Sequence, residues 1–233
     1  MPKANSLVFP QDVDGWLWKE EGEILYRLAQ LNKDLGVIVE LGSYKGKSTI
    51  CLAQGSKKVS GGKVYALDNF IGDSYVGIKK TSFYNQFLLN IEKYFLKEYV
   101  ESVKGDFSEA VKSWNKPIRL LFIDGSHNHE DVKRDFENWE PKVAHGGIIV
   151  FHDALVWPGV SKFVRQIIAS GEFSNIKIIE TYAGIVHLTK PRNGKKMSIS
   201  ATKKSISEFD RLLKAKNIKR RLLTIREKVF IRG

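Results

Sequence analysis

The stretch from Val37 to Cys51 constrains the fold more than any other part of the chain. An apolar run ends near Glu40, a loop with Gly42 and Gly46 follows, and a helical apolar pattern resumes after Ser48. A strand, a glycine turn and a helix N-terminus are therefore predicted in immediate succession. Glycine leaves no side chain between the loop and a ligand, and the free amides at a helix start favour an electron-rich group.

Two familiar nucleotide-binding loops do not fit this stretch. A phosphate loop needs four residues between its first glycine and a Gly-Lys pair, but only three residues separate Gly42 from Gly46. In the dinucleotide fingerprint the second glycine would fall at Tyr44. An ordinary strand-to-helix turn explains an isolated glycine pair equally well, so the rest of the chain must decide.

Apolar runs alternate with amphipathic stretches along the whole chain. Helical spacing is found at 19–32, 83–96, 107–114 and 158–170, and strands are predicted at 63–68, 100–103, 117–124, 143–153, 176–180 and 184–188. This order predicts an α/β fold with a doubly wound, mostly parallel sheet and an antiparallel closing strand pair. We divide the chain into an N-terminal helical region (1–35), a central domain (36–190) and a C-terminal tail (191–233).

Length and composition favour one globular domain. A chain of 233 residues can bury a sizeable core but is short for two domains. The single cysteine, Cys51, excludes an intramolecular disulfide and a cysteine-rich zinc site. The sequence has no stretch as apolar as a membrane helix and no signal-like start, so we expect a cytoplasmic protein.

The positive charge is concentrated in the tail. Fourteen basic and three acidic residues follow Lys190, which leaves about +1 of the net charge of +12 for the rest of the chain. Residues 205–230 carry apolar positions at near-helical steps among the cations, which predicts a basic amphipathic helix. Such a helix can pack on the body or on a second subunit, lie on the inner surface of a membrane, or bind nucleic acid, and we favour these three alternatives in that order. Nucleic acid comes last because the tail has few aromatic residues.

Several predicted strands end at an acidic residue. Ligands of such sheets bind outside the carboxyl ends of the strands. Asp68 follows Glu40 at an offset that suits an acid binding ribose hydroxyls. Asp106 either caps the helix that follows it or lies beside a purine ring, and both interpretations are open. Asp124 and Asp153 end two further strands.

Histidines accompany the last two of these acids. Asp124 precedes His127 by three residues, and His152 directly precedes Asp153. Two carboxylates with one or two imidazoles can converge on a divalent cation or a substrate hydroxyl, and His127 is suited to act as a base. Alternatively Asp124 caps a helix and the histidines are surface residues. We interpret His129 and His145 as surface residues.

The combination of these motifs resembles a known family. The segment Glu-Leu-Gly-Ser-Tyr-Lys-Gly-Lys-Ser at 40–48 is similar to the first motif of class I S-adenosylmethionine (SAM)-dependent methyltransferases, which have a Rossmann-like fold. Ile-Asp-Gly-Ser-His at 123–127 and Gly-Gly-Ile-Ile-Val-Phe-His-Asp at 146–153 resemble the subgroup of macrolide and rhamnosyl sugar O-methyltransferases and cephalosporin hydroxylase-like proteins. The resemblance covers roughly residues 15–190.

The resemblance implies a role for each matching residue. His127 and Asp124 would be catalytic, with His127 as the base that deprotonates an acceptor hydroxyl. The Mg2+ ligands would be Asp124, His152 and Asp153, although relatives often carry glutamate where this chain has His152. The cofactor, SAM, would be bound by Glu40, Gly42, Ser43, Tyr44, Gly46, Ser48, Asp68, Asp106 and Phe107. The implied acceptor is a small molecule or glycan, and a homo-oligomer is compatible with this assignment.

A rival enzyme uses the same residues. His127, His152 and one of Asp124 or Asp153 supply the ligand types of a two-histidine, one-carboxylate iron site, which would suit oxygen-dependent hydroxylation. A nucleic-acid methyltransferase that uses the basic tail is a second rival. An iron-dependent hydroxylase would leave the glycine loop and Asp68 without an assigned function. We therefore favour methyl transfer to a sugar hydroxyl.

Two further segments are open to interpretation. Trp16 and Trp18 are expected to be hydrophobic anchors of the N-terminal segment rather than to stack on a ligand. Residues 69–80 combine glycines with polar and aromatic residues at the place where a lid over the site would lie.

Overall fold

The computed structural model describes residues 6–71, 82–194 and 196–230. It contains one seven-stranded sheet in the order β3-β2-β1-β4-β5-β7-β6. The strands are β1 (Val37–Leu41), β2 (Val64–Asp68), β3 (Val100–Lys104), β4 (Ile118–Ile123), β5 (Val143–Phe151), β6 (Ser174–Ile179) and β7 (Ile185–Thr189). The helices are α1 (Lys19–Leu28), α2 (Lys47–Lys58), α3 (Tyr84–Lys93), α4 (Phe107–Ala110), α5 (His129–Trp139), α6 (Pro158–Ser170) and α7 (Ile199–Phe230).

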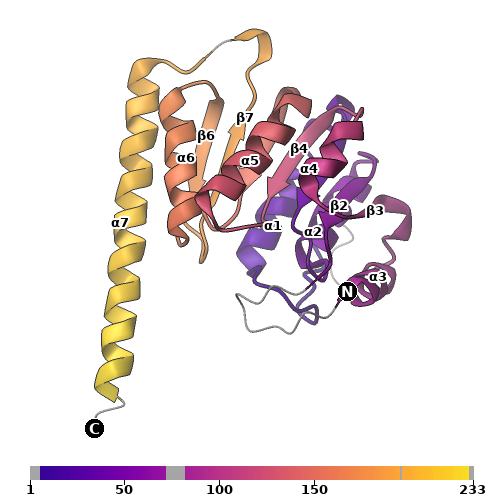
Figure 1. Ribbon diagram of the computed structural model, residues 1–233, viewed down its shortest axis with the longest axis horizontal. Coiled ribbons are helices and arrows are strands. Elements are labelled where there is room, and N and C mark those ends of the chain that lie inside the picture. The colour runs from indigo at the N-terminus through magenta and orange to yellow at the C-terminus, as the bar shows by residue number, and fades with distance from the viewer. Residues whose placement is uncertain (1–5, 72–81, 195, 231–233) are drawn as a thin grey trace.

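The sheet confirms the predicted fold class. Strands β1 to β5 pair in parallel, whereas β7 pairs antiparallel with both β5 and β6. Helices cover both faces, with α4, α5 and α6 in front of the sheet in Figure 1 and α1 and α2 behind it. Since β1 to β5 run in the same direction, their carboxyl ends meet at one edge of the sheet, and the loops that follow them lie together there.

Alternation along the strands divides the apolar core into two layers. Ile38 packs in the cluster that includes residues of α1 and α2, while its neighbour Val39 packs in the cluster that includes residues of α5 and α6. Leu120 and Leu121 of β4 divide in the same way. Both faces of β1 and β4 are therefore buried, as expected for central parallel strands with continuous apolar sequences.

Some predicted boundaries are corrected. The first helix ends at Leu28 rather than at residue 32, because Asn32 adopts a left-handed conformation (φ 53°) and starts a turn. The predicted helix 107–114 is one α-helical turn, α4, followed by 3-10 residues 111–113. Most of the expected lid, 69–80, lies outside the described residues.

The N-terminal tryptophans are not buried anchors, which corrects that expectation, and each packs instead on one tyrosine ring. Trp16 and Trp18 are 62% and 50% exposed, whereas Leu17 between them is buried. In an extended segment successive side chains point to opposite sides, so Leu17 takes the inward position and leaves both tryptophans outside.

The basic tail forms the predicted helix. Helix α7 runs beside α6 and extends past the body of the molecule (Figure 1). Its first half is attached by the buried Phe209 and Leu212, and Asp210 forms a two-contact ion pair with Arg165 of α6. Among the described residues, no helix is long and apolar enough to span a membrane.

Candidate functional site

Backbone hydrogen bonds hold the strand ends in a continuous row. The N–H of the first residue after a strand donates to a backbone carbonyl oxygen at the end of the neighbouring strand. The hydrogen-bonding pattern of the sheet therefore continues one residue into the loops. These bonds run from Gly42 to Leu67 (2.9 Å), from Gly105 to Asp68 (3.0 Å), from Asp124 to Leu41 (2.9 Å) and from His152 to Ile123 (3.2 Å). The predicted site residues are thus fixed relative to one another by main chain.

The glycine loop requires its glycines for different reasons. Gly42 has φ +91°, and a Cβ there would lie 2.2 Å from the carbonyl oxygen of Asp124. Gly46 has φ +90° and is the N-cap of α2. The loop after β1 therefore contacts the loop after β4 through bare main chain, an approach that only glycine allows.

Asp68 holds the glycine loop from the end of β2. Its Oδ2 accepts hydrogen bonds from the backbone N–H groups of Ser43 (2.9 Å) and Tyr44 (2.8 Å), and its Oδ1 accepts one from Phe70 (2.7 Å). Tyr44 has a positive φ of 45°, unusual for a residue with a side chain. Asp68 is half-buried, and a carboxylate can accept about four hydrogen bonds, so it retains capacity for ligand hydroxyls.

Glu40 lies behind the loop, inside the protein. It is fully buried and accepts hydrogen bonds from Ser48 (2.5 Å) and from the hydroxyl of Thr49. These bonds join the end of β1 to the first turn of α2. The structure therefore gives Glu40 and Ser48 a role in shaping the loop, and their direct contact with a cofactor stays a prediction. Burial raises the pKa of Glu40 to about 7.

This raised pKa predicts a pH-dependent effect of Glu40→Gln. Between the ordinary glutamate pKa of 4.5 and 7, the folded protein keeps the proton that the unfolded chain has lost, so the parent loses stability as pH rises. The loss amounts to about 3 kcal/mol at ~1.4 kcal/mol per pKa unit. Glutamine does not titrate, so denaturant unfolding at pH 5 and pH 8 should show the variant gaining stability relative to the parent at the higher pH.

A control variant is Glu208→Gln, at an exposed position of α7. Its stability relative to the parent should stay constant between the two pH values. A pH-independent difference for Glu40→Gln as well would contradict the assignment of a buried, protonated Glu40.

The residues expected beside an adenine have structural contacts of their own. The Asp106 carboxylate caps α4 by accepting hydrogen bonds from the N–H groups of Ser108 (2.7 Å) and Glu109 (3.3 Å). Phe107 lies so close to Gly125 that a Cβ on that glycine would be 2.9 Å from the ring. The capping interpretation of Asp106 is confirmed, and the adenine contact of both residues stays a prediction.

His152 lies at the centre of a buried charged cluster. Its Nδ1 faces Asp124 Oδ1 and its Nε2 faces Glu21 Oε2, both at 3.1 Å. Burial by itself would lower the pKa of His152, but the charge of Asp124 and the hydrogen bonds with Asp124, Asp153 and Glu21 raise it well above its usual value. An imidazolium that donates from both nitrogens satisfies this arrangement.

Sequence reasoning missed Glu21. It comes from α1, 131 residues before His152, and is fully buried. Its other oxygen accepts a hydrogen bond from the N–H of Ala183 at 3.0 Å, and the N–H of Trp18 donates to Oε2 at 3.1 Å. The only signal in the sequence was an acid at the third position of the helix, three residues after the N-cap Trp18, which also fits an ordinary capping box.

Asp153 holds His127 on the open side of the cluster. Asp153 Oδ2 lies 2.8 Å from His127 Nε2 and 3.6 Å from His152 Nδ1. Burial would raise the pKa of Asp153, but hydrogen bonds with His127 and His152 lower it to about 2. The His127 ring stacks on Trp157 with centroids 4.4 Å apart and an interplanar angle of 4°. The imidazole is thus fixed at its edge and at one face, while 39% of its side chain is exposed.

Three side chains could hold a cation. One ligand atom each from Asp124, His152 and Asp153 lies within 4.8 Å of the others. If Nε2 of His152 donates to Glu21, the Nδ1 lone pair points between the two carboxylates, as in metal sites where a second carboxylate orients the imidazole. The donor set fits a divalent cation. The set has one imidazole and two carboxylates, whereas the iron site of the rival enzyme has two histidines and one carboxylate.

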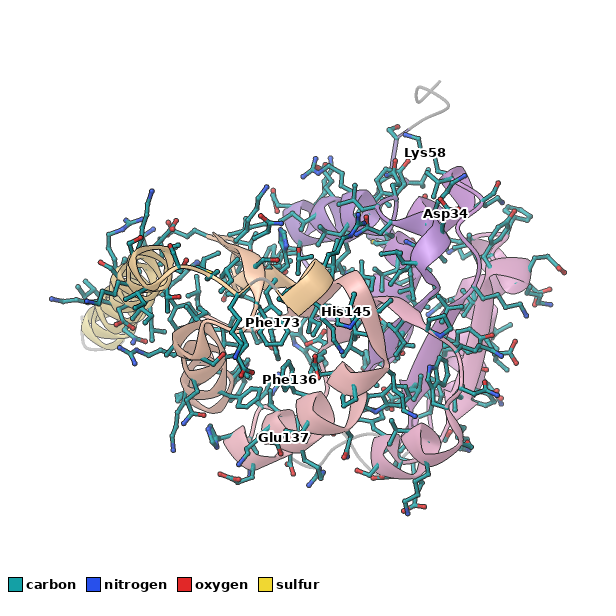
Figure 2. The ribbon with its side chains drawn as sticks, turned by 90° about the horizontal axis from the view of Figure 1, so that it is seen from above. Asp34, Lys58, Phe136, Glu137, His145 and Phe173 are labelled. Atoms are coloured by element: carbon teal, nitrogen blue, oxygen red, sulfur yellow. The ribbon has the colours of Figure 1, made fainter. Side chains whose placement is uncertain are left out.

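The two remaining histidines in question lie outside this cluster. His129 begins α5 and contacts Glu130 (2.8 Å) and Gln166 (3.0 Å). His145 lies near the start of β5, at the opposite end of the sheet, where Figure 2 labels it near Phe173. Its ring nitrogen contacts the carbonyl oxygen of Pro191 at 2.8 Å.

Comparison with known proteins gives a family match. Residues 39–154 match a family model described as a methyltransferase domain. A protein of Sinorhizobium fredii named as uncharacterized is 32% identical over 124 residues, which is 51% of this chain and 13% of that protein. An uncharacterized protein of Acanthamoeba polyphaga mimivirus is 29% identical over 170 residues, 66% of this chain and 71% of that protein. The chain therefore spans only a small part of the Sinorhizobium relative.

Solved structures share the fold at low sequence identity. An O-methyltransferase from Bacillus cereus in complex with SAH has a TM-score of 0.60 and 20% identity, covering 77% of this chain and 85% of that one. The O-methyltransferase NovP has a TM-score of 0.61 and 20% identity, with coverages of 74% and 80%. TomG from Streptomyces achromogenes, in complex with SAM, has a TM-score of 0.58 and 17% identity, with coverages of 76% and 82%.

Proposed function

We propose that residues 39–154 form a methyltransferase domain of the class I, SAM-dependent type and that the protein transfers a methyl group from SAM to a hydroxyl oxygen of a sugar or glycan. The observation that carries the proposal is the Asp153–His127 pair, which orients a partly exposed imidazole in the loop after β4, the loop whose Asp124 main chain contacts Gly42 of the glycine loop. O-methyltransferases are among the proteins that share this fold, which supports oxygen as the acceptor atom.

The glycine loop and Asp68 supply a site that suits SAM. Gly42, Ser43 and Gly46 would line the methionine part of SAM, and Asp68, which already accepts three hydrogen bonds, has capacity for one from a ribose hydroxyl. Asp106 and Phe107 follow the neighbouring strand β3, where the adenine would lie. SAM supplies a methyl group on a positively charged sulfur that leaves as a neutral thioether.

His127 is the base in this proposal. With Nε2–H donated to Asp153, the lone pair of Nδ1 can accept the proton of an acceptor hydroxyl. The oxygen then forms a bond to the methyl carbon as the carbon–sulfur bond breaks, and the electron pair of that bond stays on sulfur. The proton ends on His127 and leaves to solvent, to which the side chain is partly exposed.

Asp124, His152 and Asp153 would hold a divalent cation. A bound cation would lower the pKa of the acceptor hydroxyl. Mg2+ is the ion that the family resemblance implies, but the imidazole donor of His152 favours an ion that accepts nitrogen readily, such as Mn2+. Glu21 would orient His152 from behind by accepting its Nε2–H.

Metal removal tests this part of the proposal. Dialysis against a chelator should lower methyl transfer about tenfold or more, and Mn2+ should restore it better than Mg2+. In a His152→Glu variant, which has three carboxylates, the preference should move toward Mg2+. Full activity of the metal-stripped protein would contradict a role for the cation in methyl transfer.

The activity itself is tested by methyl transfer from radiolabelled SAM. The metal-stripped chain is incubated with labelled SAM, Mn2+ and a panel of methyl pyranosides, and the products are separated from SAM. Label in a saccharide that is released only by ether cleavage supports the proposal. Label in protein or nucleic acid alone would contradict it, and oxygen-dependent hydroxylation of the same panel with iron would favour the rival enzyme.

We further propose that the tail brings the enzyme to an anionic membrane surface. Helix α7 carries Lys203, Lys204, Arg211 and Lys214 at exposed positions, and it extends past the body. Such a surface would suit a lipid-linked glycan acceptor. The full chain should therefore sediment with vesicles that contain phosphatidylserine but not with phosphatidylcholine vesicles, and salt should weaken the interaction. Equal sedimentation with both would contradict an electrostatic contact.

A further inference from the structure

The surface around the catalytic cluster carries aromatic side chains that the proposed reaction does not use. Trp16, Trp18 and Trp157 are 62%, 50% and 47% exposed, and Tyr182 is 67% exposed. We call these four side chains the aromatic rim. The chain has five tryptophans, of which Trp16, Trp18 and Trp157 are exposed. Trp139 is fully buried, and Trp114 packs against the core. Exposed aromatic surface of this extent commonly marks a binding site.

Contacts among the rings tie the rim to the two loops that form the site. Trp16 packs on Tyr44 of the glycine loop with ring centroids 5.3 Å apart. Trp18 packs on Tyr182 at 4.7 Å. The rim therefore extends from the loop after β1 to the segment between β6 and β7.

Hydrogen bonds attach one side of the rim to the charged cluster. The backbone N–H of Trp18 donates to the same oxygen of Glu21 that faces His152 Nε2. The other oxygen of Glu21 accepts the N–H of Ala183, the residue after Tyr182. The Glu21 carboxylate thus connects the His152 ring to the backbone of Trp18 and to the backbone of the residue after Tyr182.

Trp157 attaches the opposite side of the rim. Its ring stacks on His127, and its backbone N–H donates to the carbonyl oxygen of Asp153 at 3.2 Å. The loop that carries it is bonded to the other side as well, since the N–H of Leu155 donates to the carbonyl oxygen of Ala183 at 3.2 Å. The proposed base therefore contacts one ring of the rim directly, and the loop that carries this ring is hydrogen-bonded to the segment that carries Tyr182.

We propose that the aromatic rim is the acceptor subsite and that it binds a pyranose ring of a saccharide; this inference rests on the proposed methyl transfer. The face of a pyranose presents C–H groups polarised by the ring oxygens, and these match the negative face of an indole. The hydroxyls at the edge of the sugar stay in water or reach a polar side chain. Open, half-exposed rings suit such a ligand, whereas a flat apolar acceptor needs an enclosed apolar slot.

Saccharide binding to the full chain tests this inference. Saturation-transfer NMR titrations, with SAM present, use the methyl pyranosides of glucose, galactose, mannose and rhamnose, with catechol as a planar competitor. Trp18→Ala and Trp157→Ala should each weaken binding of the tightest pyranoside about three- to tenfold, the range of a single aromatic contact. Trp157→Phe, which keeps a ring, should recover most of the affinity.

The matched control is Phe95→Ala. Phe95 is 84% exposed but lies on the turn after α3, outside the rim. Its removal should leave pyranoside binding unchanged, and all four variants should bind SAM as the parent does. The folded state of each variant is checked by its thermal unfolding.

Results that contradict the saccharide subsite can be distinguished from results that contradict the proposed methyl transfer. SAM binding without binding of any pyranoside, or weakening by Phe95→Ala equal to that of Trp18→Ala, would overturn the rim as a saccharide subsite. Displacement of the pyranosides by catechol with higher affinity, lost in the same two variants, would assign it to planar acceptors instead. Rim-dependent pyranoside binding without SAM binding would support the subsite and refute methyl transfer.

Discussion

A Gly42→Ala variant is expected to lose SAM binding and a large part of its stability. The added Cβ would lie 2.2 Å from the carbonyl oxygen of Asp124, and the residue would have to keep φ +91°. A left-handed conformation costs a residue with a side chain about 1–3 kcal/mol, and the collision adds to it because both partners are main chain. Since Asp124 also donates its N–H to Leu41, relief of the clash must separate the loops after β1 and β4.

Gly62→Ala separates backbone strain from collision. Gly62 has a similar φ of +83°, but a Cβ there meets no atom within 4 Å. Gly62→Ala should lose only the stability that the left-handed conformation costs, and it should bind SAM normally. Gly42→Ala should have an unfolding temperature several degrees below that of Gly62→Ala and should bind SAM at least tenfold more weakly. Denaturant unfolding and calorimetric titration measure the two effects. Equal losses in both variants would mean that the contact of the two loops does not shape the cofactor site.

A His127→Ala variant is expected to bind SAM normally but to transfer methyl groups about 100- to 10,000-fold more slowly, the usual contribution of a general base. The side chain is partly exposed and contacts Asp153 and Trp157 at its edge and face, so its removal should cost little stability. The loss should appear in kcat rather than in the affinity for SAM, and single-turnover transfer of labelled methyl measures it.

His129→Ala is the matched control for this variant. His129 lies two residues further along the chain but contacts Glu130 and Gln166, outside the cluster. Its substitution should leave kcat nearly unchanged, because its ring contacts Glu130, Gln166 and Phe163 and no residue of the cluster. A fall in His127→Ala no larger than that of His129→Ala would exclude His127 as the base.

The sequence predicted the parts of the site that follow strand ends. Asp68, Asp124 and Asp153 each end an apolar run, and parallel strands bring such ends to one edge of a sheet. The mostly parallel sheet and its antiparallel closing pair were predicted from the alternation of elements along the chain. These features depend on local patterns, which a single sequence records directly.

The contacts of side chains between distant segments could not be predicted in this way. Glu21 reaches His152 across 131 positions, and nothing in its local pattern distinguishes it from a capping residue. Trp16 and Trp18 were expected to be hydrophobic anchors of the N-terminal segment, but Leu17 between them takes the buried position. Which of two alternating faces is buried depends on the tertiary structure.

The central claim is most directly tested by calorimetric titration of the metal-stripped protein with SAM, in parallel with an Asp68→Ala variant. The account predicts saturable binding to the parent and at least tenfold weaker binding to the variant, because Asp68 holds both the glycine loop and the expected ribose position. No heat of binding and no thermal stabilisation of the parent at millimolar SAM would contradict SAM-dependent methyl transfer.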